Sequence, residues 1–165
     1  MATSIAVAAI AMLSGCSGAV RHNVAVPVCT STFDISAKAE VLGSNARLND
    51  EIEKASKRSG TFQAVDITRA AGWSDDWDRM VQVRVNVTMA KLNRNAGTAS
   101  CFKNLPESDG EGYRPTQFYL FVKDGKPVQS VPWPNVTSTL QFGDGVLTKD
   151  SVLSVDAKGW IVPQQ

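Results

Sequence analysis

The spacing of hydrophobic residues changes character several times along this chain. Residues 5–13 form an uninterrupted apolar run. Across residues 44–59 the apolar side chains recur every three or four positions among charged ones, which predicts an amphipathic helix that Gly60 ends, with Ser44 or Asn45 as its cap. A short second helix is predicted for residues 88–95, because Thr88 can cap its start and Gly97 follows its end.

Elsewhere the spacing is close to two, which is typical of half-buried strands. Residues 80–87 alternate valine with polar side chains, whereas residues 62–67 alternate only loosely before an acidic turn. An aromatic strand at 117–122 leads through Asp124-Gly125, a hairpin signal, into a return strand at 127–131. Later strands are predicted at 138–142, 152–155 and 159–162. The pattern predicts an α+β fold: an antiparallel sheet of four to six strands, a meander in its C-terminal half, with one or two packed helices.

Composition is that of one ordinary globular domain behind an uncharged leader. Of 165 residues, 43% are hydrophobic and 20% are charged. Seventeen basic residues against sixteen acidic ones leave a formal charge of +1, and every charge lies at Arg21 or beyond. A chain so close to neutral has no general field that would gather phosphates, so nucleic acid is not expected as a partner.

The first sixteen residues have the form of a targeting signal. The apolar run at 5–13 is too short to cross a hydrocarbon layer of about 30 Å, and it ends in Leu13-Ser14-Gly15-Cys16. This segment resembles the lipobox of bacterial lipoprotein precursors, although residues 1–13 contain no Lys or Arg. The resemblance implies cleavage before Cys16, acylation of that cysteine and a lipid anchor on the extracytoplasmic face of the cell membrane.

This resemblance also implies how the chain is divided. Residues 1–15 would be the signal peptide, 16–28 a tether, and 29–165 a single globular domain. The alternatives are that residues 1–20 stay as an uncleaved anchor, or that Cys16 is an ordinary thiol. The diacylglyceryl group expected on Cys16 carries a pair of acyl chains, which would hold the domain at the membrane far better than one acyl chain does.

The remaining cysteines, Cys29 and Cys101, suit a disulfide because such bonds persist outside the cytoplasm. Neither belongs to a Cys-x-x-Cys pair, so the bond would be structural rather than catalytic. The alternative is two buried thiols, since free cysteine behaves as a small hydrophobic residue.

Catalytic equipment is sparse in this sequence. The only histidine, His22, falls in the tether, where it cannot be held against a nucleophile in a fixed geometry. The same shortage of ligands argues against zinc. We find no cofactor signature, and we expect neither a cofactor nor a metal.

Candidate binding residues are few. Three aspartates lie close to Trp73 and Trp77: two between these tryptophans and one directly after Trp77. They could form a solvated turn, a binding surface, a calcium site or an acid–base pair acting on a sugar. Tyr113, in a long loop, and Trp133, between two prolines, could extend an exposed aromatic surface, although core packing is the competing interpretation for Trp133. The candidates are Trp73, Asp75, Asp76, Trp77, Asp78, Tyr113 and Trp133.

These features favour a non-enzymatic, membrane-tethered module that binds another envelope protein or a glycan. One alternative is an envelope hydrolase that uses Asp75, Asp76 and Asp78, which requires those carboxylates to converge in a concave site with a raised pKa. Another is a phage-encoded surface lipoprotein that blocks superinfection.

Overall fold

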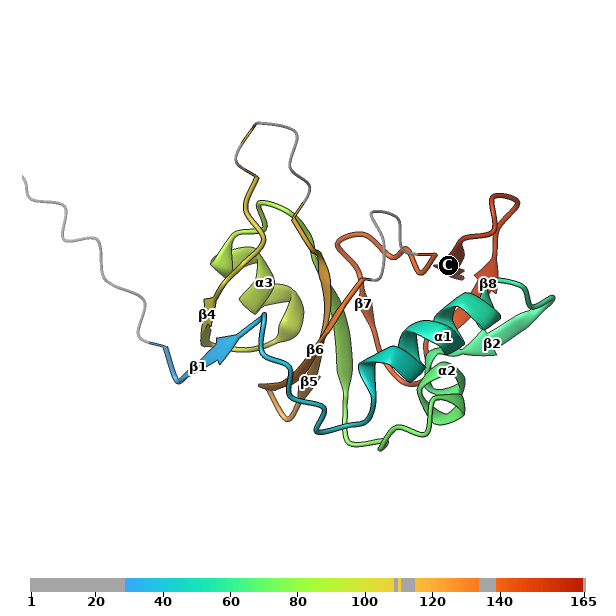
Figure 1. Ribbon diagram of the computed structural model, residues 1–165, viewed down its shortest axis with the longest axis horizontal. Helices are drawn as coiled ribbons and strands as arrows, with labels where there is room; N and C mark the ends of the chain where they lie inside the picture. Colours follow the sequence, from blue (N-terminus) through green and yellow to red (C-terminus); the bar gives the residue numbers. More distant parts are fainter. Residues whose placement is uncertain (1–28, 109, 111–114, 134–138, 165) are drawn as a thin grey trace, which may run out of the picture.

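A four-stranded antiparallel sheet with the strand order β6-β5-β3-β7 forms the framework of the computed structural model (Figure 1). The structure describes residues 29–108, 110, 115–133 and 139–164, so the lipobox, the tether and Tyr113 lie outside the described residues. The sheet consists of β3 (Arg79–Val83), β5 (Phe118–Lys123), β6 (Lys126–Pro132) and β7 (Val146–Leu147).

The predicted hairpin between β5 and β6 is confirmed. Asp124 and Gly125 connect the strands with φ angles of 47° and 69°. Both residues therefore adopt the left-handed conformation that a tight two-residue hairpin requires.

Two smaller sheets contain the other strands of the described residues. β2 (Thr61–Gln63), β8 (Val152–Val155) and β9 (Ile161–Pro163) form an antiparallel sheet, while β1 (Ser31–Asp34) pairs in parallel with β4 (Ser100–Lys103). The α+β fold with antiparallel sheets is thus confirmed. Its C-terminal strands are divided between two sheets instead of continuing as one meander, and the segment expected at 138–142 contributes only a bridge from Leu140 to Ile161.

The two predicted helices are present. α1 (Asn45–Ala55) buries Leu48, Ile52 and Ala55, but it ends before residue 59, and Glu40 rather than Ser44 accepts a hydrogen bond from its first N–H group. α3 (Met89–Ala96) begins at its Thr88 cap and ends at Gly97, whose φ is 66°.

A third helix, α2 (Ala64–Ala70), forms where the sequence alternates loosely, so the described residues contain one helix more than the one or two expected. A capping box starts it: the Asp66 carboxylate accepts a hydrogen bond from the Gln63 N–H at 2.8 Å. Its β-branched residues Val65 and Ile67 are buried, and they gave the segment the look of a strand.

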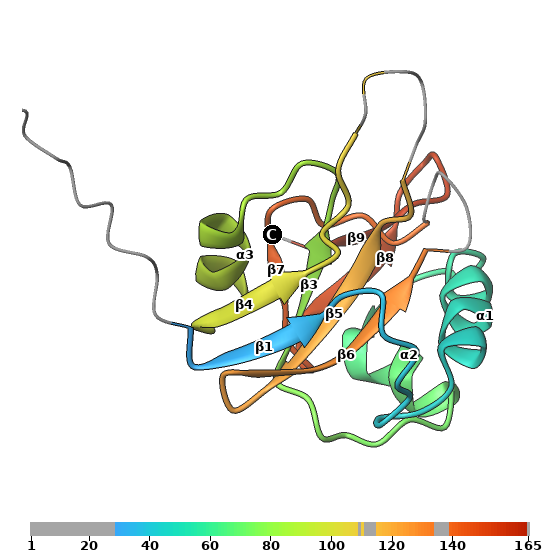
Figure 2. The same cartoon turned by 60° about the vertical axis from the view of Figure 1, so that its left-hand side comes forward.

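Both faces of the central sheet are covered (Figure 2). Because side chains alternate along a strand, Tyr119 and Phe121 of β5 join the core that α1 and α2 share, whereas Leu120 and Val122 join the core beneath α3 and the β1–β4 pair. Two hydrophobic cores, one on each face, hold the domain together.

The expected disulfide is formed. Cys29 and Cys101 are bonded across a separation of 72 residues, with their Cα atoms 5.3 Å apart. The bond joins the residue at the start of the described domain to β4.

The outer edge of β6 is protected by side chains. Asn45 and Asn49 of α1 donate hydrogen bonds to the carbonyls of Ser130 and Pro132 at 3.2 and 3.1 Å. These contacts occupy acceptors that an exposed edge strand would offer to another chain.

Candidate functional site

The three candidate tryptophans that the structure describes belong to the core. Trp73, Trp77 and Trp133 are 5%, 0% and 7% exposed. The rings of Trp73 and Trp77 pack against Phe121 with centroid separations of 4.9 and 5.4 Å, and Trp133 packs against Tyr119 at 5.3 Å. These indoles therefore supply no exposed aromatic surface, and the core interpretation of Trp133 is correct.

The three aspartates point to separate partners. Asp75 accepts hydrogen bonds from Arg69 of α2 at 2.6 and 3.0 Å. Asp76 accepts one from the neighbouring Ser74 hydroxyl at 2.9 Å. Each carboxylate serves a local contact, so these two do not converge in a common site.

Asp78 instead fastens the β5–β6 hairpin to the start of β3. Its carboxylate accepts hydrogen bonds from the Asp124 N–H at 2.7 Å and from Lys123 Nζ at 3.1 Å. The Asp78 N–H also donates to the Val122 carbonyl at 2.8 Å. Asp78 therefore links the start of β3 to the β5–β6 hairpin.

Electrostatics count against acid catalysis by this segment. Hydrogen bonds from Arg69 hold the pKa of Asp75 below its ordinary value. The Asp124 N–H, followed by Lys123, lowers the pKa of Asp78. A general acid that works near neutral pH needs a raised pKa, so the lowered pKa values of Asp75 and Asp78 count against their use as the acid of a hydrolase.

A polar groove lies elsewhere, beside α3, and we call it the α3 groove. It runs between the end of β3, the first turns of α3 and the loop that precedes β7, and its volume is about 350 Å³. Volumes of this order are typical of small-ligand sites. The polar side chains that line it are Gln82, Arg84, Asn86, Thr88, Lys91, Asn95 and Asp144.

The groove exists because β3 stops earlier than its alternating sequence predicts. The strand ends at Val83, and Asn86 then takes a φ of 59°. The Asn86 N–H donates to the Pro106 carbonyl at 2.8 Å, and its side-chain oxygen accepts from the Ser108 N–H at 3.0 Å. These contacts turn the chain toward α3. An asparagine two residues before a capping threonine is the sequence signal that could have indicated this turn.

Arg84 is held over the groove by neutral groups. Its Nη2 donates to the amide oxygens of Gln82 at 3.2 Å and Gln141 at 3.1 Å. Gln82 is itself buried and donates to the Leu140 carbonyl at 3.0 Å. Among the described residues, no carboxylate forms an ion pair with Arg84.

Lys91 and Asp144 face each other across the groove. Their Nζ and carboxylate atoms are 2.8 Å apart, and Asn95 donates to the Asp144 carbonyl at 3.2 Å. The Lys91 hydrogen bond, then the charges of Lys91 and Arg84, lower the pKa of Asp144. The described lining of the groove therefore combines two cations, Arg84 and Lys91, with one carboxylate, Asp144.

A second groove, between α1 and α2, offers a useful contrast. It has a similar volume of about 340 Å³ and is lined by Arg47, Asp50, Glu51 and Lys54. Lys54 is already paired with Glu51 at 2.6 Å, and acidic side chains balance the basic ones. This groove has no excess charge to select a ligand.

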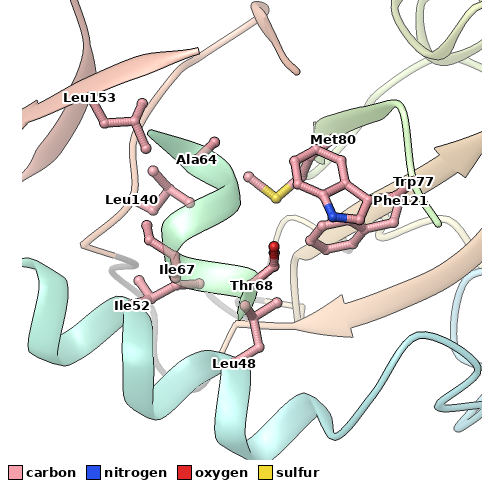
Figure 3. A pocket seen from close by; sticks show the side chains of 10 residues that line it. All are labelled: Leu48, Ile52, Ala64, Ile67, Thr68, Trp77, Met80, Phe121, Leu140 and Leu153. Atoms are coloured by element: carbon pink, nitrogen blue, oxygen red, sulfur yellow. The ribbon is translucent and has the colours of Figure 1, made fainter. Parts of the chain in front are cut away.

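A small internal cavity lies between the central sheet and the α1–α2 pair (Figure 3). Its volume of about 10 Å³ is that of a single water site. The indole nitrogen of Trp77 and the hydroxyl of Thr68 are the polar groups among its lining side chains, and Trp77 Nε1 has no hydrogen-bond partner within the described residues. The cavity is too small for an organic ligand.

No three His, Cys, Asp or Glu side chains in the part of the chain that the structure describes come close enough to hold a metal ion. No helix within it has the length and apolar character needed to span a membrane.

Comparisons with known proteins gave no relative: no family model, no curated protein and no solved structure matches this chain.

Proposed function

We propose that this chain is a lipid-anchored, non-enzymatic binding module of the bacterial cell envelope, which captures another envelope component through the α3 groove. The Leu13-Ser14-Gly15-Cys16 motif supports the anchor. The Cys29–Cys101 disulfide supports a location outside the cytoplasm, because such bonds are rare in reducing compartments.

The observation that carries the binding role is the α3 groove itself. It is concave, polar and about 350 Å³ in volume. Its cations are exposed to solvent, and hydrogen bonds or an ion pair with neighbouring side chains hold them in place. Grooves of this kind favour recognition over chemistry when no nucleophile and base are paired in them.

In-cell photocrosslinking tests the role of the groove. Val85 lines the α3 groove, and Val152 of β8 is an exposed valine outside it, so a photoreactive residue at each position gives a probe and a matched control. We expect a discrete crosslinked species from position 85 and none from position 152. Equal yields from both positions, or none from either, would contradict a binding role for the α3 groove.

Cys16→Ala tests the anchor separately. We expect the unchanged chain to fractionate with membranes and to carry the mass of a lipid modification at Cys16. The variant should lose both properties, together with the crosslink from position 85. A variant that stays membrane-bound without the modification would contradict the lipid anchor.

A further inference from the structure

Arg84 in the α3 groove has unused capacity for an anion. Within the part of the chain that the structure describes, its Nη2 alone forms side-chain hydrogen bonds, and both acceptors are neutral amide oxygens at 3.1 and 3.2 Å. A guanidinium group forms its strongest hydrogen bonds with carboxylate or phosphate oxygens, often in pairs. The glutamines thus fix the orientation of Arg84 without neutralising its charge.

The groove already holds one oxyanion, which belongs to the chain. The Asp144 carboxylate lies 2.8 Å from Lys91 Nζ, although its side chain is 70% exposed. An ion pair so open to solvent contributes little to stability. A ligand can therefore displace Asp144 from Lys91 at small cost.

Asp144 sits in a loop whose shape requires glycine on either side. Gly143 has a φ of 61°, and a Cβ atom on Gly145 would lie 2.8 Å from the Phe142 carbonyl oxygen. The backbone thus presents Asp144 to the groove, while the side chain remains free to rotate into solvent.

The described lining of the groove favours an anion over a neutral sugar. It contains no aromatic ring on which a sugar face would stack, and its side chains are charged or amide groups together with Val85, Val87, Thr88 and Leu92. The charge balance between Arg84, Lys91 and Asp144 is positive.

We propose that the α3 groove binds an oxyanion, the carboxylate or phosphate group of an envelope component, between Arg84 and Lys91 and in competition with Asp144. This inference rests on the proposed function, because it names the ligand chemistry of the same groove. If the ligand competes with Asp144 for Lys91, substitutions of Arg84 and Asp144 should change anion affinity in opposite directions, which a purely structural role of these residues does not predict. Removing the Arg84 charge weakens anion binding, whereas removing the Asp144 charge strengthens it.

The test titrates the full chain, labelled with ¹⁵N and purified in detergent, with inorganic phosphate and separately with acetate at constant ionic strength. We expect saturable amide shifts confined to residues 84–95 and 143–145. Arg84→Gln should weaken binding about tenfold, as expected for the loss of hydrogen bonds to a charged group. Asp144→Asn should strengthen binding about threefold, the size of an exposed ion pair. Arg47→Gln, in the second groove, should leave binding unchanged.

The two probes distinguish the sources of the oxyanion. Saturation by both supports a general oxyanion site, and saturation by phosphate alone supports a phosphate ligand. Shifts that do not saturate, or weaker binding in Asp144→Asn, would overturn the proposal. Lys91→Gln repeats the test if Arg84→Gln fails to fold. If phosphate or acetate binds with the expected signs but position 85 gives no crosslink, this inference stands and the proposed function is rejected.

Discussion

The acidic segment 74–78 and the α3 groove differ in how far their polar groups are already committed. In the acidic segment each aspartate is paired within the domain, to Arg69, to Ser74 or to the β5–β6 hairpin. In the groove, the hydrogen bonds of the Arg84 side chain to described residues go to neutral amides, and the neighbouring Lys91–Asp144 ion pair is open to solvent. The closely spaced aspartates of segment 74–78 therefore have structural partners. In the α3 groove, by contrast, residues that are spread along the sequence include a cation that is not paired with a described carboxylate.

The largest effect should come from the core beside the acidic segment. Trp77 is fully buried and its ring meets Phe121 edge-on. Trp77→Ala should lower the free energy of unfolding by about 4 kcal/mol, because it removes a large apolar side chain and leaves a cavity. Urea denaturation measures the change. A loss below about 1 kcal/mol would show that the segment is not anchored as described.

The next effect should come from the α3 side of the sheet. Replacing both Cys29 and Cys101 with alanine should cost about 3 kcal/mol, since the bond closes a long loop in the unfolded chain. Reducing the unchanged protein under the same urea series should give a similar loss. If reduction leaves the unfolding midpoint unchanged, the bond does not stabilise this half of the domain.

Asp78 should show a smaller effect that depends on pH. Asp78→Ala removes hydrogen bonds from Asp124 and Lys123 and should cost about 1 kcal/mol near neutral pH. Because its folded pKa is lowered, its contribution is present above the ordinary value of 3.8 and is lost as the pH falls through the folded pKa. Unfolding at pH 6 and pH 2.5 should therefore show a smaller difference for the variant than for the unchanged protein. If the free energy of unfolding depends on pH identically in the two proteins, the Asp78 carboxylate does not stabilise the link to the hairpin.

The smallest effect on stability is expected for Arg84→Gln. The side chain is exposed and forms no ion pair with a described residue, so the free energy of unfolding should change by no more than about 0.5 kcal/mol. Thermal unfolding with circular dichroism measures it. A loss above about 2 kcal/mol would place Arg84 among the structural residues and remove the contrast with the acidic segment.

Much of the fold follows from local sequence signals. The Thr88 and Gly97 pair fixed the limits of α3, and the Asp124-Gly125 turn fixed the hairpin, because both depend on backbone conformations that few residues adopt. The amphipathic spacing of Leu48 and Ile52 likewise identified α1. Such signals act over a few residues and can be recognised without the rest of the chain.

The remaining features depend on contacts that are distant in sequence. α2 was missed because Val65 and Ile67 are β-branched and the helix is short. The end of β3 at Val83 was missed because Asn86 is turned by Pro106 and Ser108, about twenty residues away. The same contacts create the α3 groove, so the candidate site was not visible in the sequence, while the buried tryptophans made the acidic segment look more functional than its contacts support.

The Cys29–Cys101 bond also determines how the domain would bear a mechanical load. If the chain is tethered at its N-terminus, a pull reaches the folded part at Cys29 and passes through a covalent bond into β4. Neither β1 nor the residues between the two cysteines need transmit the force. A load applied at the tether would be borne directly by the α3 side of the domain, next to the groove, without first peeling β1 from β4.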